Sequence, residues 1–405
     1  MKYDLVLLGA TSFVGRLTAE YLLKLQEEQG FSMAFAGRSL GRIERLKDRL
    51  GADEIDMIEV NVKDKTSVDY MVQSAKVVIT VVGPYAELGE PIVAACAKHG
   101  VDYVDLTGES PWVKRMIDKY SVQAIGSGAR IVHSCGFDSI PSDLGVFALN
   151  RFASDQQLDC DRIDMRVVSA SGGLSGGTIA SLAGVIKKAA KSSKIRRLLK
   201  DPYALCPAPI SGRLVPHARQ DPMLTPHIDE DFDQWRAPFL MATVNTKVVH
   251  RSNYLLDASY GQAFVYSEAM LTGSGLAGRA KATAITAGLG AVTAGYTVKV
   301  GQKILGWVMP SQGDGPSQSS IDNGKYVIKF TAKQGDQAKA RLKLVAMGDP
   351  GYGSTSKMLS HAALALLETD KSVDGGFWTP ASVMGEPLLE RLEQHHVWDL
   401  EYSTL

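Results

Sequence analysis

The stretch Gly9-Ala10-Thr11-Ser12-Phe13-Val14-Gly15 decides the fold of this chain. It follows an apolar run, Tyr3–Leu8, that we expect to form a buried strand, and it opens a helical pattern over Gly15–Gln29. In the dinucleotide-binding fingerprint, glycines at such a junction make a tight turn, let the backbone approach a pyrophosphate and allow close packing of helix on strand. The stretch therefore predicts a dinucleotide-binding loop in which residues 9 to 15 contact the cofactor.

One position of this loop departs from the fingerprint. Ser12 stands where the middle glycine is usual, whereas Gly9 and Gly15 keep the outer places. The Ser12 hydroxyl offers a hydrogen bond to a phosphate, although its Cβ narrows the approach. A pyrophosphate would rest on the helix N-terminus, where unsatisfied N–H groups and the helix dipole favour an anion. A plain structural turn is the alternative interpretation.

Short apolar runs and helical patterns alternate through the first 150 residues. Beyond the first strand we expect strands at Ser32–Ala36, Asp56–Val60, Val77–Val82, Tyr103–Leu106 and Arg130–Ser134, with helices between them. Alternation of this kind is typical of a doubly wound parallel sheet with right-handed crossovers. The sequence predicts an α/β protein whose residues 1–150 form a Rossmann dinucleotide-binding domain.

The end of the second predicted strand indicates which dinucleotide binds. This strand runs into Gly37-Arg38-Ser39, where a site that prefers NAD would place Asp or Glu to hold the ribose 2′-hydroxyl. The planar guanidinium of Arg38 suits a phosphate instead, and Ser39 is an additional donor. We therefore expect NADP(H) as the cofactor. The alternative is a surface arginine that caps the next helix.

The alternation stops after Asn150. Arg162–Ser169 is predicted to be a strand, the proline-rich stretch Asp201–Pro238 a long loop, and Ala242–Val249 and Tyr254–Tyr260 strands of an antiparallel sheet. We expect an inserted domain of mixed or antiparallel α+β structure over residues 151–350, which serves substrate binding or dimerisation.

The last third of the chain has clearer patterns. Tyr326–Ala332 and Gln337–Val345 are predicted to pair as a hairpin. Helices are expected at Thr355–Glu368 and Gly385–Gln394, and residues 351–405 would pack back on the first domain as a C-terminal helical return.

Composition excludes several classes of protein. Hydrophobic residues at 45% and charged residues at 22% exclude a largely disordered chain. Equal numbers of basic and acidic residues, 44 each, argue against nucleic-acid binding. The four cysteines are far apart and predict neither disulfides nor a metal site. No stretch has the character of a spanning helix, so we expect a cytoplasmic protein.

A cluster of cations suggests a partner. Lys187–Lys200 holds seven basic residues in fourteen positions and no acid. A solvated helix face explains such a cluster most simply. The alternative is docking to an anionic partner, such as an acyl carrier protein, a coenzyme A phosphate or an anionic membrane surface.

A second segment, Ala269–Gly313, is apolar, rich in glycine and free of acids. It suits three environments equally well: a peripheral position at a membrane interface, the cover of a lipid-sized pocket, or the interface of a homodimer.

Motifs along nearly the whole chain carry a family resemblance. The chain resembles the saccharopine dehydrogenase-like oxidoreductases, and within them the branch of trans-acting enoyl reductases. The motifs are Gly9–Gly15, Ala36–Ser39, Val82–Tyr85, Tyr103–Glu109, Ser134–Asp143, Gly176–Thr178, Gly351–Lys357 and Thr379–Ser382. The resemblance implies an NADP-type Rossmann domain with an inserted mixed sheet. Characterised relatives in this branch act on lipid or polyketide-derived intermediates, and true saccharopine reductases act on amino-acid adducts.

Two residues are candidates for the chemistry. Val82, Gly83 and Pro84 follow an apolar strand at the edge where α/β sheets bind ligands, so we expect them to contact the cofactor. Tyr85 comes next and would donate a proton, contact cofactor or substrate, or only pack. Asp138 resembles the aspartate of the Gly-x-Asp-Pro-Gly motif in saccharopine-type reductases, although Ser139 replaces the proline.

Three acids have simpler interpretations. Asp138 or Asp143 would cap the helix that starts near Pro141, and Glu109 is expected to accept hydrogen bonds from loop backbone.

Together these features predict an NADPH-dependent oxidoreductase that reduces a lipid-like enoyl or conjugated carbonyl substrate resting on the inserted sheet. A saccharopine-type amino-acid reductase and a non-catalytic NADP-binding scaffold at membranes are the alternatives.

Overall fold

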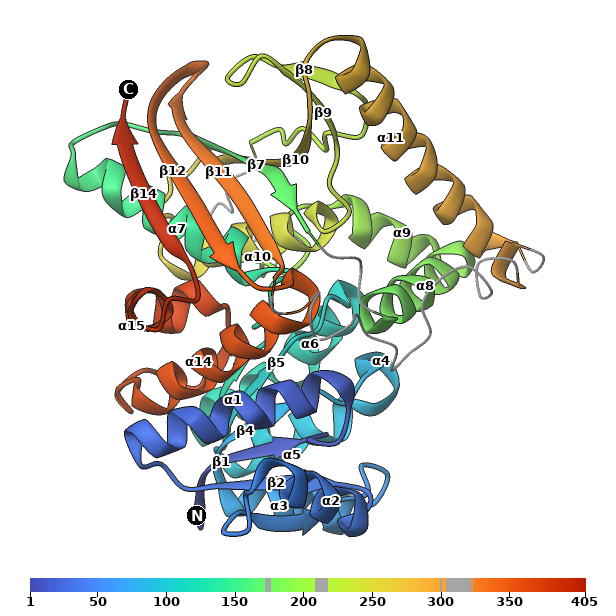
Figure 1. Cartoon of the computed structure of the whole chain (residues 1–405), viewed down its shortest axis with the longest axis vertical. Helices are drawn as coiled ribbons and strands as arrows, with labels where there is room; N and C mark the ends of the chain where they lie inside the picture. The colour runs from blue at the N-terminus through green and yellow to red at the C-terminus, as the bar shows by residue number, and fades with distance from the viewer. Residues whose placement is uncertain (172–175, 208–217, 299–300, 304–320, 322) are drawn as a thin grey trace.

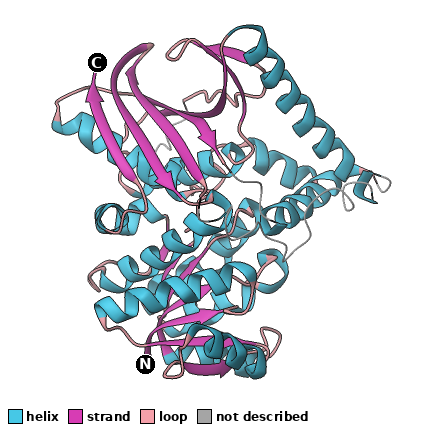
Figure 2. Ribbon diagram, viewed as in Figure 1, coloured by secondary structure: helices cyan, strands magenta, loops and turns pink. Residues whose placement is uncertain are grey.

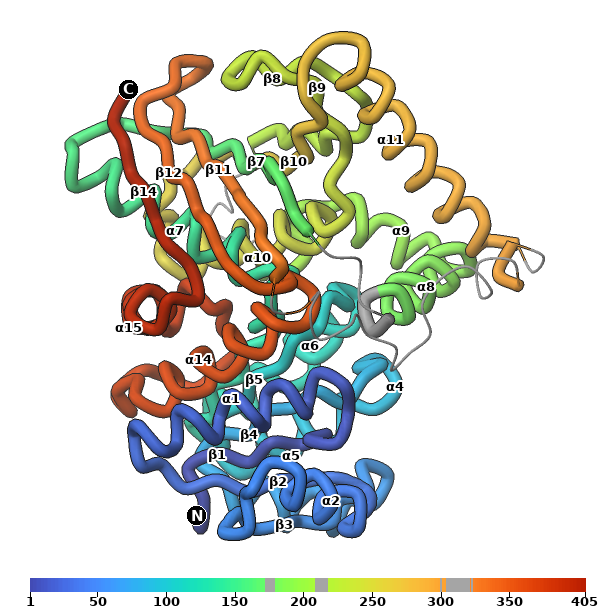
Figure 3. The backbone as a smooth tube through the Cα atoms, in the orientation of Figure 1, coloured from blue at the N-terminus to red at the C-terminus, as the bar shows by residue number. Residues whose placement is uncertain are grey.

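Two seven-stranded sheets, one above the other in Figure 1, organise the chain. The computed structural model describes residues 1–171, 176–207, 218–298, 301–303, 321 and 323–405. The N-terminus lies at the bottom of the first sheet and the C-terminus at the top of the second, as the backbone tube in Figure 3 shows.

The first sheet is parallel throughout and has the strand order β13-β6-β5-β4-β1-β2-β3. Its first six strands in chain order follow the order 3-2-1-4-5-6 of dinucleotide-binding domains. The strands are β1 (Tyr3–Leu8), β2 (Met33–Gly37), β3 (Asp56–Glu59), β4 (Ala75–Thr80), β5 (Asp102–Asp105), β6 (Arg130–Val132) and β13 (Gly376–Trp378). The α/β Rossmann prediction is therefore confirmed.

Helices cover both faces of this sheet, as Figure 2 shows. Leu5 and Leu7 of β1 face the core shared with α1 and α14, whereas Val6 and Leu8 face the core of α3, α5 and α6. Successive side chains of a strand point to opposite faces, so a strand covered on both sides needs the continuous apolar run found here. The helices of this domain are α1 (Phe13–Gln29), α2 (Leu40–Leu50), α3 (Lys65–Ser74), α4 (Tyr85–Leu88), α5 (Glu90–His99) and α6 (Ser110–Ser127).

The second sheet is mixed, in the order β14-β12-β11-β7-β10-β9-β8, and only its β7–β10 pair is parallel. The predicted hairpin is confirmed, because β11 and β12 pair in antiparallel register up to the turn. The strands are β7 (Arg162–Ala170), β8 (His227–Asp229), β9 (Gln234–Pro238), β10 (Val265–Gly273), β11 (Lys325–Gln334), β12 (Gln337–Met347) and β14 (Asp399–Thr404).

The remaining helices connect the two sheets or pack against one of them. They are α7 (Ile140–Asp155), α8 (Gly176–Lys191), α9 (Ser193–Lys200), α10 (Ala242–Leu255), α11 (Gly275–Thr297), the π-helical turn η1 (Pro350–Ser354), α14 (Thr355–Glu368) and α15 (Pro380–Gln394). Helix α7 runs on past residue 150 and packs against β11 and β12.

The strands predicted at Ala242–Val249 and Tyr254–Tyr260 are wrong. The first lies in helix α10, and the second starts at the end of that helix and continues into a turn. Threonine and valine favour strands, but tertiary packing overrides propensity. Here the Asn245 amide donates a hydrogen bond to the Ser142 hydroxyl of α7, and Val249 is fully buried. Helix α10 packs against α7 and against β10 of the second sheet.

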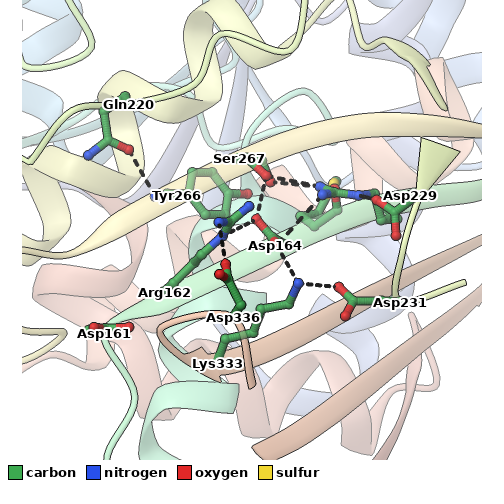
Figure 4. A network of polar contacts seen from close by, with 12 residues as sticks. Asp161, Arg162, Asp164, Gln220, Asp229, Asp231, Tyr266, Ser267, Lys333 and Asp336 are labelled. Atoms are coloured by element: carbon green, nitrogen blue, oxygen red, sulfur yellow. Dashed lines mark hydrogen bonds and ion pairs between the residues drawn. The ribbon is translucent and has the colours of Figure 1, made fainter. Parts of the chain in front are cut away.

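The predicted loop Asp201–Pro238 contains two edge strands, β8 and β9, and its residues 208–217 lie outside the described residues. Buried ion pairs fix this edge (Figure 4). Asp229 pairs with Arg166 of β7. The amine of Lys333 on β11 lies 2.6 Å from the Asp231 carboxylate and 3.2 Å from the Asp164 carboxylate. Periodicity does not detect strands of this kind, because charge pairing holds them in place.

The C-terminal segment packs on the first domain through α14, which contacts α1, β4 and β5. It is more than a helical return, however, because β13 extends the first sheet and β14 extends the second. Strand β13 has three residues and was too short to predict from alternation.

The apolar segment Ala269–Gly313 divides into two elements. It begins as the end of β10 and continues as helix α11, whereas residues 299–300 and 304–313 lie outside the described residues. Within the described part of the chain, no helix is long and apolar enough to cross a membrane.

Candidate active site

A cavity of about 1070 Å³ opens at the carboxyl ends of the first sheet's strands. Open α/β sheets bind ligands at this edge. Loops after β1, β2, β3, β4, β5 and β6 form one side of the cavity, and α8, α9, α10 and η1 form the other. Strands of the second sheet contribute no lining residue among those described, and helices of the inserted domain line the cavity instead. The cavity therefore does not support the expectation of a substrate that rests on the inserted sheet.

The glycines of the loop after β1 are required by close backbone contacts. Gly9 has φ +92°, and a Cβ there would lie 2.9 Å from a methyl carbon of Val82. A Cβ on Gly15 would lie 2.1 Å from the carbonyl oxygen of Gly9. Only glycine therefore allows β1, the loop and α1 to meet this closely.

Ser12 caps helix α1. Its Oγ accepts a 3.0 Å hydrogen bond from the Gly15 N–H, which leaves the hydroxyl proton available to a phosphate. Thr11, Ser12, Phe13 and Val14 line the cavity together with Gly9, whereas Ala10 and Gly15 are buried behind them.

Cations gather where the cavity passes the end of β2. Arg38 and Ser39, the two residues expected to bind the cofactor here, line the cavity, and so do Arg42 and Lys63, which sequence reasoning missed. Arg42 follows Arg38 by four residues, and this spacing is a signal that could have found it. All three cations are exposed.

The segment after β4 forms the middle of the wall. Val82, Gly83, Pro84 and Tyr85 all line the cavity. The Tyr85 hydroxyl donates a 3.0 Å hydrogen bond to the Thr80 carbonyl, so it is bound to the backbone of β4. Burial raises the pKa of Tyr85 well above 10.

Glu109 holds this segment in place, as predicted. Its carboxylate accepts hydrogen bonds from the backbone N–H groups of Tyr85, at 2.9 Å, and Ala86, at 3.1 Å. The Ser181 hydroxyl of α8 donates to the same carboxylate at 3.3 Å. Burial raises the pKa of Glu109. This side chain therefore connects the first domain to the inserted one.

Asp105, at the end of β5, was not predicted. Its carboxylate accepts hydrogen bonds from the N–H groups of Thr107 and Ser134, both at 3.0 Å, and from the Tyr103 hydroxyl at 2.8 Å. It is fully buried and joins the two loops that follow β5 and β6. The motif Tyr103–Glu109 was the available signal.

Asp138 and Asp143 separate in the structure. Asp138 is half-buried and lines the cavity just after β6. Asp143 lies in the first turn of α7, accepts hydrogen bonds from the Ser252 hydroxyl and from the Ala381 N–H of α15, and is buried. Burial raises its pKa to about 7. The helix α7 begins after Ser139, so Ser139 occupies the N-cap position that was considered for these acids.

These features fit NADP(H). Because Gly9 and Gly15 have no side chains, a ligand can approach the backbone at the start of α1. The N–H groups of the first turn lack acceptors within the helix and can bind a phosphate there. Arg38, Arg42 and Lys63 supply positive charge where a 2′-phosphate would lie, at the position at which an NAD site carries an acid. Fold and site together define an NADP-binding oxidoreductase of the Rossmann class.

Comparisons with known proteins give the family. Residues 5–132 match the saccharopine dehydrogenase NADP binding domain. A protein of Mycobacterium tuberculosis, provisionally named a trans-acting enoyl reductase, is 40% identical over 96% of this chain and 95% of its own length. The trans-acting enoyl reductase of Mycobacterium ulcerans is 36% identical over 97% of this chain and 96% of its own. The chain belongs to the saccharopine dehydrogenase-like NADP oxidoreductases, as the motifs predicted.

A solved structure supports the fold. Saccharopine dehydrogenase (L-Glu forming) from Saccharomyces cerevisiae matches with a TM-score of 0.56 and 12% identity, covering 100% of both chains. At this identity the match shows the shared architecture alone.

Proposed function

We propose that the protein uses NADPH to reduce a carbon–carbon double bond conjugated to the carbonyl group of a lipid-like acyl chain. The observation that carries this proposal is the apolar character of the cavity beyond the cofactor end. Its aliphatic walls come from α4, α8, α9, α10 and the two residues before α10. The side chains are Leu88, Leu182, Val185, Leu199, Leu240, Met241 and Val244.

Charge argues against an amino-acid substrate. From Val81 onward, the one charged side chain among the described lining residues is an acid, Asp138. Recognition of substrate carboxylates normally uses Arg or Lys, whereas an acyl chain needs only apolar contacts. The cations Arg38, Arg42 and Lys63 lie at the other end, with the loops after β2 and β3. An enoyl substrate therefore fits the lining better than a saccharopine-type adduct.

The chemistry adds a hydride and a proton across the double bond. Bound NADPH supplies the hydride and becomes NADP⁺, and the proton goes to the carbon next to the carbonyl group. The chain's contribution is to place the reacting carbons. Val82 to Pro84 line the cavity after β4, and Met241 and Val244 line it at the start of α10, close to Gly108. Aliphatic side chains around this point limit the access of bulk water to the hydride.

Tyr85 and Asp138 are the two candidates for proton delivery. The Tyr85 hydroxyl already donates to a backbone carbonyl, which supports a positioning role for its ring. Asp138 is half-buried in the cavity wall and can hold a water molecule beside the substrate. We assign the proton to water held at Asp138.

A direct assay tests the proposed function. Purified protein is mixed with NADPH and 2-enoyl thioesters of N-acetylcysteamine of increasing chain length, and NADPH consumption is measured at 340 nm together with the mass of the product. We expect a saturated thioester and higher kcat/KM for longer chains. Consumption of NADPH only with a 2-oxo acid and an amine would replace this function by amino-acid reduction. Tight NADPH binding without turnover on either class would favour the non-catalytic scaffold.

A homodimer stays a prediction of the sequence. Light scattering during size-exclusion chromatography, which gives the mass in solution, tests it.

A further inference from the structure

Helices α8 and α9 carry an exposed cationic surface. It consists of Lys187, Lys188, Lys191, Lys194, Arg196, Arg197 and Lys200, and all seven side chains are exposed. Among the described residues, none of these cations lies within ion-pair distance of a carboxylate. An isolated solvated helix face usually intersperses both signs of charge. A surface of one sign attracts a partner of the opposite sign.

The two helices form a fixed platform. The Arg196 guanidinium donates hydrogen bonds to the carbonyl groups of Ala189, at 2.8 Å, and Ala190, at 3.3 Å, which lie in the last turn of α8. The Lys247 amine of α10 donates to the Leu199 carbonyl at 3.0 Å. These hydrogen bonds hold α8 and α9 together and anchor them to α10, so the cations lie on a fixed pair of helices. The pair lies beside α6 in Figure 1.

The same platform lines the apolar half of the cavity. Leu182 and Val185 of α8 and Leu199 of α9 contribute to its wall. The same two helices therefore present cations to solvent and aliphatic side chains to the cavity. A partner that binds the cationic surface is placed next to the substrate end of the cavity and away from Arg38.

From this placement we infer that the cationic surface docks an acidic carrier domain, which delivers the acyl chain into the apolar half of the cavity on a thioester-bearing arm. The inference rests on the proposed function. Docking is non-covalent and the thioester bond stays intact, so the only bonds that change are those of the NADPH-dependent reduction. Charge attraction steers encounter and sets orientation, and this effect weakens as salt is added.

Charge and side-chain size favour a protein partner over a membrane. A helix that binds a membrane surface sets bulky apolar or aromatic side chains beside its cations. Helix α11, which contacts α8, exposes mainly small residues such as Ala280, Ala284, Ala287 and Ala291. Its exposed larger apolar side chain, Leu276, lies in the first turn, and the other long exposed side chains on this helix are the cations Arg279 and Lys281. Small side chains insert little into lipid, whereas the seven cations match an acidic protein face.

Charge reversal tests the inference. The variant K191E/K194E/R197E changes three exposed cations and leaves Arg196 and the cavity lining in place. The matched control K24E/K325E/K339E reverses three lysines on α1, β11 and β12. Each protein is assayed with an enoyl thioester of N-acetylcysteamine and with the same enoyl chain loaded on a recombinant acidic acyl carrier protein.

We expect the first variant to lose about tenfold or more in kcat/KM for the carrier-borne chain and to stay within about twofold for the free thioester. The control variant should match wild type with both substrates, and added salt should reduce the difference between the variants. Equal kcat/KM for the carrier-borne chain in wild type and K191E/K194E/R197E would overturn the inference. Loss of co-sedimentation with phosphatidylglycerol vesicles in that variant, with unchanged carrier kinetics, would assign the surface to a membrane instead.

Failure of the proposed function gives a different result. If no enoyl thioester is reduced, fluorescence anisotropy of the labelled carrier still measures docking. Binding by wild type that K191E/K194E/R197E loses would support the docking surface while the enoyl activity is rejected. Absence of binding by wild type would reject the docking surface itself.

Discussion

Oδ2 of Asp105 lies 2.6 Å from Nδ1 of His133, in a part of the first domain that solvent does not reach. The same carboxylate binds the backbone N–H groups of Thr107 and Ser134. The loops that start at these residues line the cavity. The first contributes Gly108 and Ser110, and the second contributes residues Gly136–Asp138. One buried carboxylate therefore sets the position of two loops that line the cavity.

Replacing Asp105 by Asn is expected to reduce kcat and leave cofactor binding intact. An amide keeps one acceptor but turns the other into a donor, so it cannot accept all the hydrogen bonds that this carboxylate accepts. Displacement of the two loops should lower kcat by about 10- to 100-fold, because small errors in substrate placement are costly. The Kd for NADPH should stay within threefold of wild type, because Arg38 and the loop after β1 lie elsewhere. Steady-state kinetics and cofactor titration measure both.

Asp102→Asn is the matched control, since Asp102 is a buried aspartate at the other end of the same strand. It pairs with Arg130 and Lys371, far along β5 from the cavity. This variant should lose about 3–5 kcal/mol in the free energy of unfolding, because a buried arginine loses its charged partner. Its folded fraction should keep wild-type kcat. Equal kcat losses in both variants would show that Asp105 acts only through stability.

Arg38→Ala is expected to weaken NADPH binding and leave NADH binding almost unchanged. Hydrogen bonds between a guanidinium and a phosphate contribute about 1.5–3 kcal/mol, which corresponds to about 10- to 150-fold in Kd. Arg42 and Lys63 remain nearby and should limit the loss to the lower part of this range. Fluorescence titration with both cofactors measures the change.

Arg45→Ala serves as the control for Arg38, because Arg45 is exposed on helix α2, which begins two residues after Arg38, and does not line the cavity. Equal affinity of the wild type for NADPH and NADH, together with unchanged NADPH binding by Arg38→Ala, would contradict the assignment of the 2′-phosphate to this end.

Tyr85→Phe and Asp138→Asn separate the two predicted catalytic residues. Removing the Tyr85 hydroxyl breaks its bond to the Thr80 carbonyl and leaves the ring in place, so we expect less than a fivefold change in kcat. Asp138→Asn should lower kcat by about 100-fold, the size of effect typical of general acid–base groups. A large loss in Tyr85→Phe that depends on pH would instead identify Tyr85 as the proton donor.

The cofactor half of the site was predictable from the sequence, because local patterns define it. The stretch Gly9–Gly15 joins a strand and a helix that are contiguous in the chain, and Arg38 directly follows the next strand. The substrate half depends on distant contacts. Leu182, Leu199 and Met241 come together only when α8, α9 and α10 pack over the first domain, and no spacing in the sequence records this.

The missed elements of the fold have the same cause. Valine and threonine in α10 favour a strand locally, but buried contacts with α7 make it a helix. Strands β8, β13 and β14 form at sheet edges. Strands β13 and β14 depend on pairing with β6 and β12, which lie far away in the chain, and β8 pairs with its chain neighbour β9 at an edge that buried ion pairs hold. Helix α14, by contrast, has a long apolar pattern of its own and was predicted at the observed residues.

Asp143→Asn is expected to stabilise the protein increasingly as the pH rises. Burial raises the pKa of Asp143 to about 7, whereas in the unfolded chain this carboxyl ionises near 4. Between these pH values the native state holds one proton more than the unfolded state, so its stability falls as pH rises and the loss is complete above the native pKa. Asparagine cannot ionise and therefore removes this loss.

Urea unfolding of both proteins at pH 5 and pH 8 measures the effect. The difference in unfolding free energy, variant minus wild type, should increase by about 1–3 kcal/mol over this interval. Subtracting wild type cancels the opposite trend of His250, whose pKa burial lowers to about 3 and whose neutral form favours the native state at higher pH. The exposed Asp53→Asn, as a control, should show no such increase. A difference that stays constant from pH 5 to pH 8 would mean that Asp143 ionises normally in the native protein, and that its contacts with Ser252 and the first turn of α15 offset its burial.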